Sequence, residues 1–396
     1  MRRRFVLLGM LGLVGLFGAV SGGSAATPVA AGWGGAVGVS GSAALYRNSD
    51  ASVLSVSCAA AGDCVAGGYY LDDGSGYHRQ AFVVSETNGS WGKPIEVPGT
   101  AILNRQANAL VDSVSCAAAG DCVAGGVYTD GSGNSQAFVV SETNGSWGDA
   151  IEVPGTGTLS GYSVSAVVES VSCGAVGDCV AGGLYLTGSV VQAFVVSETN
   201  GVWGDAIEVP GTGTLNSGGD AGVSSVSCAA AGDCSAGGQY TDGSGHLQAF
   251  VVSEQNGVWG DAIEVPGTAT LNTGGKARVY EVSCAAAGDC IAGGGGFYPG
   301  SSSHPRAFVV SETNGSWSNA IAVRNFPFSC VVPRVVGKAL RAAKRELNAS
   351  HCGVGRITRA YSKRKKGRVV TQLPKPGRHL SRGAKVALTV SKGKTT

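Results

Sequence analysis

One motif recurs five times in this chain at nearly constant spacing. Each copy contains two cysteines separated by five residues, and the first cysteine falls at positions 58, 116, 173, 228 and 284. A tryptophan that follows an Asn-Gly pair recurs with the same period, at positions 91, 147, 203, 259 and 317. Most solenoid repeats are shorter, so a period of 55 to 58 residues favours the blades of a β-propeller.

A single repeat divides into four short segments with the character of β-strands. In the second copy these are Ser113–Cys116, Cys122–Tyr128, Gln136–Glu142 and Trp147–Val153. The Asn144-Gly145 pair between the last two segments is the usual signal for a tight hairpin. The third segment is apolar at consecutive positions, which predicts that neighbouring blades cover both of its faces. Four antiparallel strands per repeat is the form of a propeller blade.

We therefore predict a mainly β chain, with a propeller of about five four-stranded blades in residues 27–324 and a small α+β domain in residues 330–394. An additional copy of the fourth strand at residues 33–40 either completes the closing blade or is the remnant of a lost one, so six blades remain an alternative. The five blades are expected near residues 53–100, 111–156, 168–212, 223–268 and 279–324.

The first 26 residues have the three parts of a secretory signal peptide. Arg2–Arg4 form a basic start, Phe5–Val20 carry no charge, and the small residues Ser24–Ala26 suit a cleavage site. The apolar run is shorter than the ~20 residues that a spanning helix needs. Cleavage after Ala26 is therefore favoured over an uncleaved anchor, and we expect an exported chain without membrane attachment after cleavage.

Twelve cysteines in an exported chain predict disulfide bonds. We expect each closely spaced pair to close on itself, and the two remaining cysteines to join. No histidine recurs beside these pairs and the spacing is not that of a zinc site, so neither a metal nor another cofactor is expected. The predicted disulfides are Cys58–Cys64, Cys116–Cys122, Cys173–Cys179, Cys228–Cys234, Cys284–Cys290 and Cys330–Cys352.

Charge is unevenly divided along the chain, although the net charge is only +2. Residues 330–396 carry 18 Lys or Arg and one acid, whereas residues 27–329 carry 8 basic and 26 acidic residues. The basic segment predicts attraction to a polyanion. It has no nucleic-acid-binding motif and a single tyrosine for base stacking, so nucleic acid is not expected. A basic face that docks on the acidic repeats, or that only aids solubility, is the alternative.

The repeats resemble two known patterns. The Ser-x-x-Asn-Gly-x-Trp turn between the third and fourth strands resembles the Asp-box hairpin of sialidase-like propellers, although it is one residue shorter and lacks the Asp. In that family the hairpin is structural, so the resemblance implies architecture and not activity. The cysteine motif also resembles the repeats of uncharacterised exported bacterial proteins.

The basic segment has its own pattern of elements and motifs. Leu340, Ala343 and Leu347 have helical spacing, and short strands are expected at 355–362, 368–372 and 385–391. The segment resembles the PASTA domain, a module attached to penicillin-binding proteins and Ser/Thr kinases. The matching residues are Val332-Pro333, Gly337, Ala343, Gly353-Val354-Gly355, Gly367, Val369-Val370, Gln372, Pro374, Pro376-Gly377, Gly383, Val386, Val390-Ser391 and Gly393.

The resemblance implies binding to peptidoglycan fragments in the cell envelope, although some PASTA domains are only spacers. This chain carries a single copy, and neither a kinase nor a transpeptidase precedes it. A basic run stands before Gly367, where the family has a loop. The candidate wall-binding residues are Lys363, Arg364, Lys365, Lys366 and Arg368.

The linkers between the repeats are the segments in which the otherwise similar copies differ. They span residues 104–111, 160–168, 216–223 and 272–280, and the predicted strand order places them on one face with the turns between second and third strands. Constant scaffolds with variable loops suggest a recognition face, with neutral drift as the alternative. The candidate ligand-binding residues are Tyr77, His78, Arg105, Tyr162, Asp220, His246, Lys276, Arg278 and Tyr280.

No catalytic constellation is recognisable, so no catalytic residue is predicted. A glutamate at the end of each third strand (Glu142 in the second repeat) and an aspartate before each second cysteine (Asp121) recur in every repeat, which predicts roles in the fold. We expect the aspartates to cap their own local turns. A hydrolase would instead need two carboxylates about 5–9.5 Å apart. Its candidates are the non-repeated acids Asp112, Glu169, Asp220 and Glu281.

These features predict a monomeric, secreted and cell-wall-associated bacterial protein that binds without catalysis. Its basic domain would hold peptidoglycan or an anionic wall polymer, and its propeller face would bind a glycan or a protein. The main alternative is a secreted carbohydrate-active hydrolase anchored to the wall. A purely structural or adhesive protein is a third possibility.

Overall fold

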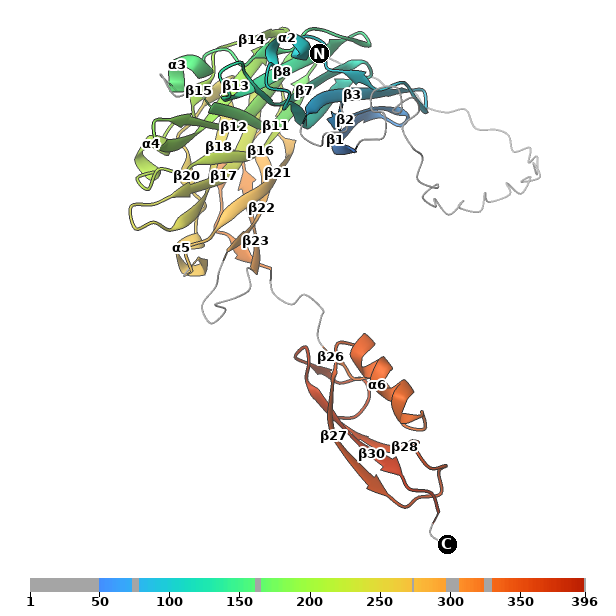
Figure 1. Cartoon of the computed structure of the whole chain (residues 1–396). Coiled ribbons are helices and arrows are strands. Elements are labelled where there is room, and N and C mark those ends of the chain that lie inside the picture. The colour runs from blue at the N-terminus through green and yellow to red at the C-terminus, as the bar shows by residue number, and fades with distance from the viewer. Residues whose placement is uncertain are drawn as a thin grey trace, which may run out of the picture. The chain divides into compact units, whose positions relative to one another are not determined.

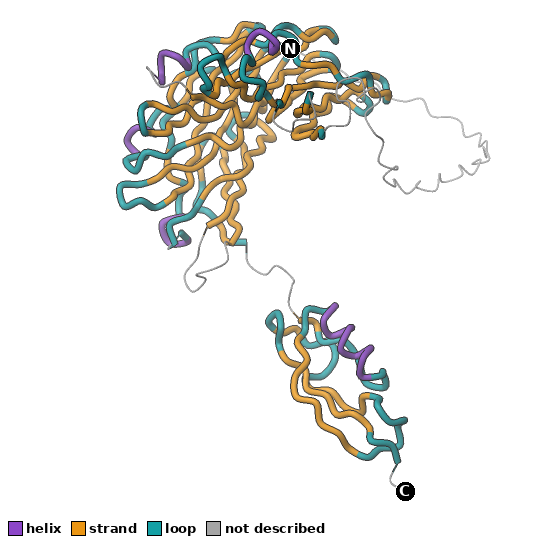
Figure 2. Tube along the Cα trace, in the orientation of Figure 1, coloured by secondary structure: helices purple, strands orange, loops and turns teal. Residues whose placement is uncertain are grey.

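The computed structural model describes residues 50–72, 78–160, 165–272, 274–296, 306–323 and 330–394 (Figure 1). The predicted signal peptide and the additional strand at 33–40 lie outside these residues, as do the candidates Tyr77 and Tyr162. Strands dominate the described chain, as predicted, and its helices are few and short (Figure 2). Within these ranges, no helix has the length and apolarity that crossing a bilayer requires.

Five antiparallel sheets follow one another along the chain, one for each repeat, as predicted. The sheets comprise β1 (Ala51–Ala60), β2 (Asp63–Leu71), β3 (Arg79–Thr87), β4 (Ser90–Trp91) and β5 (Ile95–Glu96); β6 (Leu110–Ala118), β7 (Asp121–Thr129), β8 (Ser135–Thr143), β9 (Ser146–Trp147) and β10 (Ile151–Glu152); β11 (Ser165–Ala175), β12 (Asp178–Thr187), β13 (Val190–Thr199), β14 (Val202–Trp203) and β15 (Ile207–Glu208); β16 (Gly222–Ala230), β17 (Asp233–Thr241), β18 (Leu247–Gln255), β19 (Val258–Trp259) and β20 (Ile263–Glu264); and β21 (Arg278–Ala286), β22 (Asp289–Gly296), β23 (Arg306–Thr313), β24 (Ser316–Trp317) and β25 (Ile321–Ala322). We number the sheets as blades 1 to 5.

The fourth strand of each blade is broken into two pieces, both paired with the third strand, whereas we expected one continuous strand. In blade 2 the hairpin before it has Asn144 at φ 49° and Gly145 at φ 78°, two left-handed residues that suit a tight β-turn. In blades 2 to 5 the break coincides with a hydrogen bond to the preceding blade. The Ala150 amide donates a 2.7 Å hydrogen bond to the Pro98 carbonyl of blade 1, and so leaves its own sheet.

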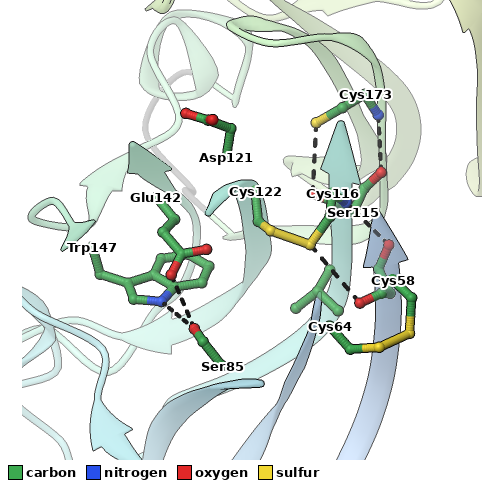
Figure 3. The surroundings of a disulfide bond; sticks show 12 residues. Cys58, Cys64, Ser85, Ser115, Cys116, Asp121, Cys122, Glu142, Trp147 and Cys173 are labelled. Carbon is green, nitrogen blue, oxygen red and sulfur yellow. Dashed lines mark hydrogen bonds between the residues drawn. A yellow bond between two sulfur atoms is a disulfide. The ribbon is translucent and has the colours of Figure 1, made fainter. Parts of the chain in front are cut away.

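All six predicted cysteine pairs are disulfide-bonded. In each blade the bond joins directly opposed residues of the first two strands, such as Cys116 on β6 and Cys122 on β7 (Figure 3). The hairpin that connects these strands is thereby closed at its tip. No free cysteine occurs in the chain.

The linkers between blades contain short helices that we did not predict: α2 (Thr100–Leu103), α3 (Thr156–Ser160), α4 (Thr212–Leu215) and α5 (Thr268–Leu271). Before α2, Gly99 adopts a left-handed φ of 81°, which reverses the chain after Pro98. The buried Thr100 hydroxyl then donates a 2.6 Å hydrogen bond to the Val97 carbonyl. Leu103 packs on the core between blades 1 and 2, so the linker attaches one blade to the next.

The main core lies between successive blades. Val111 and Val114 of β6 pack over Gly67 on β2, and a Cβ atom added at Gly67 would lie 2.6 Å from Val111 Cγ1. Only glycine therefore fits at that position while the valines remain. The third strands of blades 1 to 4 are covered on both faces, as predicted, and in blade 2 Phe138, Val139 and Val140 are all buried.

The first strands of the blades, β1, β6, β11, β16 and β21, pack in succession at the inner side of the array. Among the described residues β21 does not pack on β1 as these neighbours pack on one another, so the interface between blades occurs four times and does not close the array into a ring. The exposure of equivalent valines also shows that β1 lacks a neighbouring first strand on one side in the described part of the chain. Val56 on β1 is 65% exposed, whereas Val114 on β6 is 5% exposed.

The C-terminal unit consists of β26 (Cys330–Val331), α6 (Leu340–Ala349), β27 (Gly353–Ala360), β28 (Val369–Leu373), β29 (His379–Leu380) and β30 (Lys385–Ser391). The predicted helix is present, and its Ala343 and Leu347 are buried against the sheet residues Val369, Val386 and Leu388. β30 lies between a parallel β27 and an antiparallel β28. The disulfide Cys330–Cys352 ties β26 to the end of α6, as predicted.

The packing between blades predicts unequal effects of one substitution at equivalent positions. Val171→Ala removes a side chain that is 5% exposed between blades 2 and 3, and should lower the free energy of unfolding by about 2 kcal/mol. Val56→Ala changes an exposed side chain and should cost less than about 0.5 kcal/mol. Denaturant unfolding of both variants in dilute solution tests this, and equal losses would contradict the assigned core.

Candidate functional site

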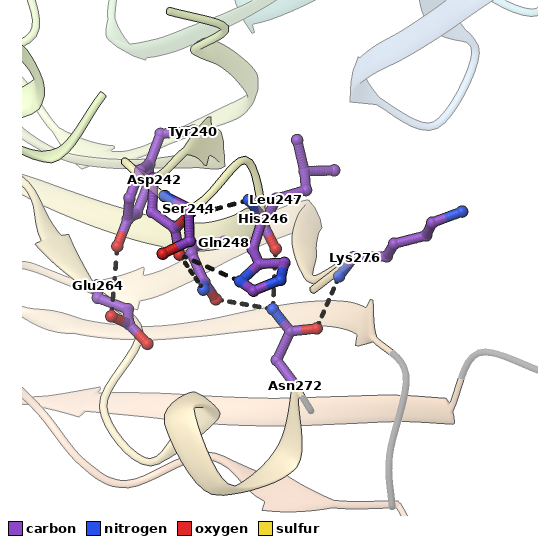
Figure 4. Close-up of polar contacts among 9 residues, drawn as sticks. All are labelled: Tyr240, Asp242, Ser244, His246, Leu247, Gln248, Glu264, Asn272 and Lys276. Atoms are coloured by element: carbon purple, nitrogen blue, oxygen red, sulfur yellow. Dashed lines mark hydrogen bonds and ion pairs between the residues drawn. The ribbon is translucent and has the colours of Figure 1, made fainter. Parts of the chain in front are cut away.

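The turn between the second and third strands of blade 4 is organised by Asp242 (Figure 4). Its Oδ1 accepts hydrogen bonds from the amides of Ser244 (2.8 Å) and His246 (2.9 Å). Its Oδ2 accepts a bond from Gln248 Nε2 (2.8 Å), and these bonds lower the pKa of the carboxyl group. The backbone that carries His246 is therefore fixed, while the imidazole is more than half exposed.

The following linker is held against the same turn by Asn272 (Figure 4). Asn272 Nδ2 donates to Gln248 Oε1 (2.7 Å) and to the Leu247 carbonyl (2.8 Å). Asn272 Oδ1 accepts a bond from the Lys276 amide (2.8 Å). The backbone of Lys276 is thus positioned beside that of His246.

The same hydrogen-bonded frame, an Asn that bonds a Gln side chain and a linker amide, recurs between other blades. The side chains at its surface differ from one linker to the next. Asn104 bonds Gln80 and accepts from the Asn108 amide, and Asn216 bonds Gln192 and accepts from the Asp220 amide. One backbone position thus carries Asn108, Asp220 or Lys276 on successive linkers. A constant frame with variable side chains is what the recognition-face hypothesis requires of this face.

The structure places the predicted ligand-binding residues in two groups. His78, Arg105, Asp220, His246 and Lys276 lie on the turns and linkers, as predicted. Arg278 and Tyr280 belong instead to the inner strand β21, where the Arg278 guanidinium lies 5.8 Å from the centre of the Tyr280 ring.

A second cluster lies at the inner strands, and we had considered its acids only for the hydrolase alternative. Asp112 and Glu169 occupy equivalent bulge positions on the neighbouring strands β6 and β11. Burial, and then the charge of Glu169, raises the pKa of Asp112 to about 7. Burial also raises the pKa of Glu169, while the charge of Arg278 opposes that rise. The two carboxyl groups are therefore electrostatic neighbours at the inner surface.

The other two acids of that alternative do not share this strand position. Asp220 lies on the linker before β16, and Glu281 Oε1 accepts a 3.3 Å bond from Ser225 Oγ. The bulge position of the cluster is occupied on β16 by Ser224 and on β21 by Tyr280. The cluster that the structure supports thus consists of two acids, Arg278 and Tyr280. The shared bulge position is a sequence signal that could have identified it.

The repeated glutamates have a role in the fold, as predicted. Glu142 on β8 is buried and accepts a 2.9 Å bond from Ser85 Oγ of the preceding blade (Figure 3). Trp147 Nε1 donates to the same hydroxyl at 3.4 Å, so three side chains link two blades. Burial raises the pKa of Glu142. Equivalent bonds join Ser141 to Glu198, Ser197 to Glu254 and Ser253 to Glu312.

The repeated aspartates act differently from our expectation. Asp121 Oδ1 accepts a 3.2 Å bond from the Asn144 amide, which belongs to the hairpin between the third and fourth strands. Asp63 bonds the Asn88 amide in the same way. The local turn cap that we predicted was wrong, because the disulfide hairpin lies against this second hairpin and offers it an acceptor.

The candidate wall-binding residues lie in the loop between β27 and β28, and their side chains are exposed. The buried Ser391 holds the backbone of this loop, since its hydroxyl donates to the Arg364 carbonyl at 2.8 Å and its carbonyl accepts from the Gly367 amide. Arg368 differs from the others, because its guanidinium bonds the Gly337 carbonyl at 2.8 Å. Lys363, Lys365 and Lys366 are thus presented to solvent on a fixed backbone.

The C-terminal unit corresponds to a known family over almost its whole length. Residues 331–392 match the PASTA domain family. The match confirms the resemblance drawn from the sequence. PASTA domains are associated with binding peptidoglycan or other cell-wall components.

Several solved structures are similar to this chain at low sequence identity. A neuraminidase-like protein of A/flat-faced bat/Peru is 14% identical, with a TM-score of 0.38 over 71% of this chain and 74% of that one. A protein of unknown function from Dyadobacter fermentans is 12% identical, with a TM-score of 0.41 over 71% and 85%. A fucose-specific lectin from Aleuria aurantia is 11% identical, with a TM-score of 0.33 over 71% and 80%. No curated protein matches the sequence.

The raised pKa of Asp112 predicts a dependence of stability on pH. The folded protein holds a proton at Asp112 that the unfolded chain releases near the ordinary aspartate pKa of 3.8, so the free energy of unfolding falls as pH rises from there to about 7. Asp112→Asn removes this loss and should raise the unfolding midpoint at pH 8, with little change at pH 4. Asp149→Asn, at an exposed position, is the control. A gain of equal size at both pH values would contradict the assignment.

Proposed function

We propose that this chain is an exported bacterial envelope protein that binds peptidoglycan or an anionic wall polymer through its PASTA domain. The observation that carries the proposal is the loop at residues 363–366, whose cationic side chains are exposed on a backbone fixed by Ser391. The domain around it has 18 basic residues and one acid. Attraction to a polyanion therefore acts over the whole domain, and the loop supplies local contacts.

Several other basic residues of the PASTA domain face solvent on the helix. Arg341, Lys344 and Arg345 on α6 are exposed, whereas Lys338 is engaged by Glu346. The helix therefore offers a matched set of three charges on an element other than the loop. Removing either set changes the net charge equally, which separates a local binding site from general attraction.

Sedimentation with purified cell wall tests the proposal. Lys363→Gln, Lys365→Gln and Lys366→Gln together should weaken binding about tenfold at low salt, about 1.4 kcal/mol, and reduce its salt dependence. The same three changes at Arg341, Lys344 and Arg345 should weaken it much less. Equal losses would assign binding to net charge alone, and absence of binding by the native protein would overturn the anchoring role.

We propose that the blades serve recognition through the turn and linker face, with a glycan or a protein as ligand. The repeated frame of Asn and Gln side chains supports this, since it fixes the backbone while the surface residue changes from linker to linker. The alternative, a carbohydrate-active hydrolase, is favoured by one observation, the proximity of Asp112 and Glu169. Two neighbouring acids, one of which has a raised pKa, are a feature that acid–base catalysts use.

One ligand screen separates these two functions. The protein is incubated with muropeptides and a glycan library, and both retained and altered molecules are analysed by mass spectrometry. If the face serves recognition, the native protein should retain unaltered ligands. The double variant His246→Ala/Lys276→Ala should lose this binding, and Asp112→Asn should keep it. A shortened glycan whose formation Asp112→Asn abolishes would establish the hydrolase instead.

A further inference from the structure

Each of the four interfaces between blades repeats the same interlocking contact. Two valines from the first strand of one blade pack over a glycine on the second strand of the preceding blade. A Cβ atom added at that glycine would lie 2.6 to 2.7 Å from a valine methyl group at every interface. The sets are Gly67 with Val111 and Val114, Gly125 with Val168 and Val171, Gly182 with Val223 and Val226, and Gly237 with Val279 and Val282.

Each end of the array presents one of the two partners of this contact, the valines on blade 1 and the glycine on blade 5. On blade 1, Val53 and Val56 are 46% and 65% exposed, whereas their counterparts in the other four blades are 0 to 5% exposed. On blade 5, Gly293 stands at the glycine position, and a Cβ atom added there would meet nothing within 4 Å. Its neighbours Ile291 and Val309 are 55% and 38% exposed, whereas the corresponding valines of blades 1 to 3 are 0 to 3% exposed.

At each end of the array, residues that form hydrogen bonds between blades elsewhere have no adjacent blade to bond among the described residues. Inside the array, the Cys116 amide donates to Ser57 Oγ of the preceding blade at 3.0 Å, and the equivalent bond recurs at each interface. Ser283 of blade 5 stands at this acceptor position. Ser311 on blade 5 is the counterpart of the donor Ser85, and Glu86 on blade 1 is the counterpart of the acceptor Glu142. Both Ser311 and Glu86 are more exposed than the buried Glu142.

One residue of blade 1, Pro94, differs from its counterparts in a way that suits the first blade of the array. Ala150, Ala206, Ala262 and Ala320 each donate their amide to the proline carbonyl of the preceding linker. Blade 1 has Pro94 at this position, which has no amide hydrogen. A buried amide without the linker carbonyl would be left unpaired, which destabilises a folded protein. Proline removes that donor, so blade 1 can join another blade without a covalent linker.

We propose that the two ends join different copies of this chain, with blade 5 of one copy packing on blade 1 of the next. Val53 and Val56 of the second copy would then pack over Gly293, which continues the interface that already joins the blades. The four equivalent interfaces do not bring β21 to pack on β1 within one chain, so the exposed contact residues at the two ends are left for a second copy. The contact is heterologous, and it forms a ring or an extending chain of copies.

This proposal replaces our sequence-based expectation of a monomer and does not depend on the ligand of either domain. Assembly would also place several PASTA domains on one particle. Because linked modules bind with a raised effective concentration, each added copy would slow release from a polymeric wall.

Cross-linking between two differently sized variants tests the contact. One chain is expressed from Thr27 and carries Val53→Cys. The other chain differs from it in length and carries Gly293→Cys, so that a mixed dimer can be recognised by its size. At the four internal interfaces, the valine Cβ equivalent to that of Val53 lies 3.1 to 3.4 Å from the ideal glycine Cβ, close to the spacing in a disulfide. Mild oxidation should give a mixed dimer on a non-reducing gel. Pairing Gly293→Cys with Val202→Cys, at an exposed position on β14 of blade 3, should give none.

Analytical ultracentrifugation supplies an independent measurement of the same proposal. The native protein should associate as its concentration rises, and Val56→Lys should shift the association midpoint at least tenfold upward. Val202→Lys is the matched control, because Val202 is 69% exposed and Val56 is 65% exposed. Both variants should keep the native circular dichroism spectrum, since neither residue contributes to the core.

Three results would overturn the proposal. The native protein could sediment as a monomer at every concentration. The double variant Val53→Cys/Gly293→Cys could form its cross-link within a single chain, which would show closure of the ring. The thiol introduced at position 53 could be unreactive in the monomer, which would show that residues 27–49 of the same chain cover blade 1.

Discussion

The packing of two valines over a glycine is the contact on which the architecture depends. The glycine lies on the second strand, where the neighbouring blade approaches too closely for any larger side chain. Because the valines come from the first strand of the next blade, each blade is stabilised chiefly by its neighbours. The disulfide at the tip of each hairpin holds the two strands that carry the glycine and the valines.

A scaffold built from repeated interfaces leaves two regions in which residues differ between copies. One is the turn and linker face, where Asn216, Asp242 and Asn272 accept hydrogen bonds from the amides of Asp220, His246 and Lys276. The other is the bulge of the first strands, which carries Asp112 in blade 2, Glu169 in blade 3 and Tyr280 in blade 5. Variation at both places leaves the packing between blades unchanged. The PASTA domain separately supplies positive charge on a loop whose backbone Ser391 holds.

Local patterns in the sequence were sufficient to predict much of this structure. The cysteine spacing predicted every disulfide, the Asn-Gly pairs predicted the hairpins, and the spacing of Leu340, Ala343 and Leu347 predicted α6. These features depend on residues close together in the chain. The proximity of Asp112 and Glu169, 57 positions apart, depends on the packing of two blades and was not predicted. The bond from Ala150 to Pro98, which coincides with the break in the fourth strand, was missed for the same reason.

The central claim is that each blade depends on its neighbours, and hydrogen exchange of the backbone amides in dilute solution measures this most directly. Blades 1 and 5 have a neighbour on one side only, so opening either of them should require less free energy than opening a central blade. The account predicts that β1, β2, β22 and β23 exchange clearly faster than the corresponding strands of blades 2 to 4. Equal protection in all five blades would contradict it.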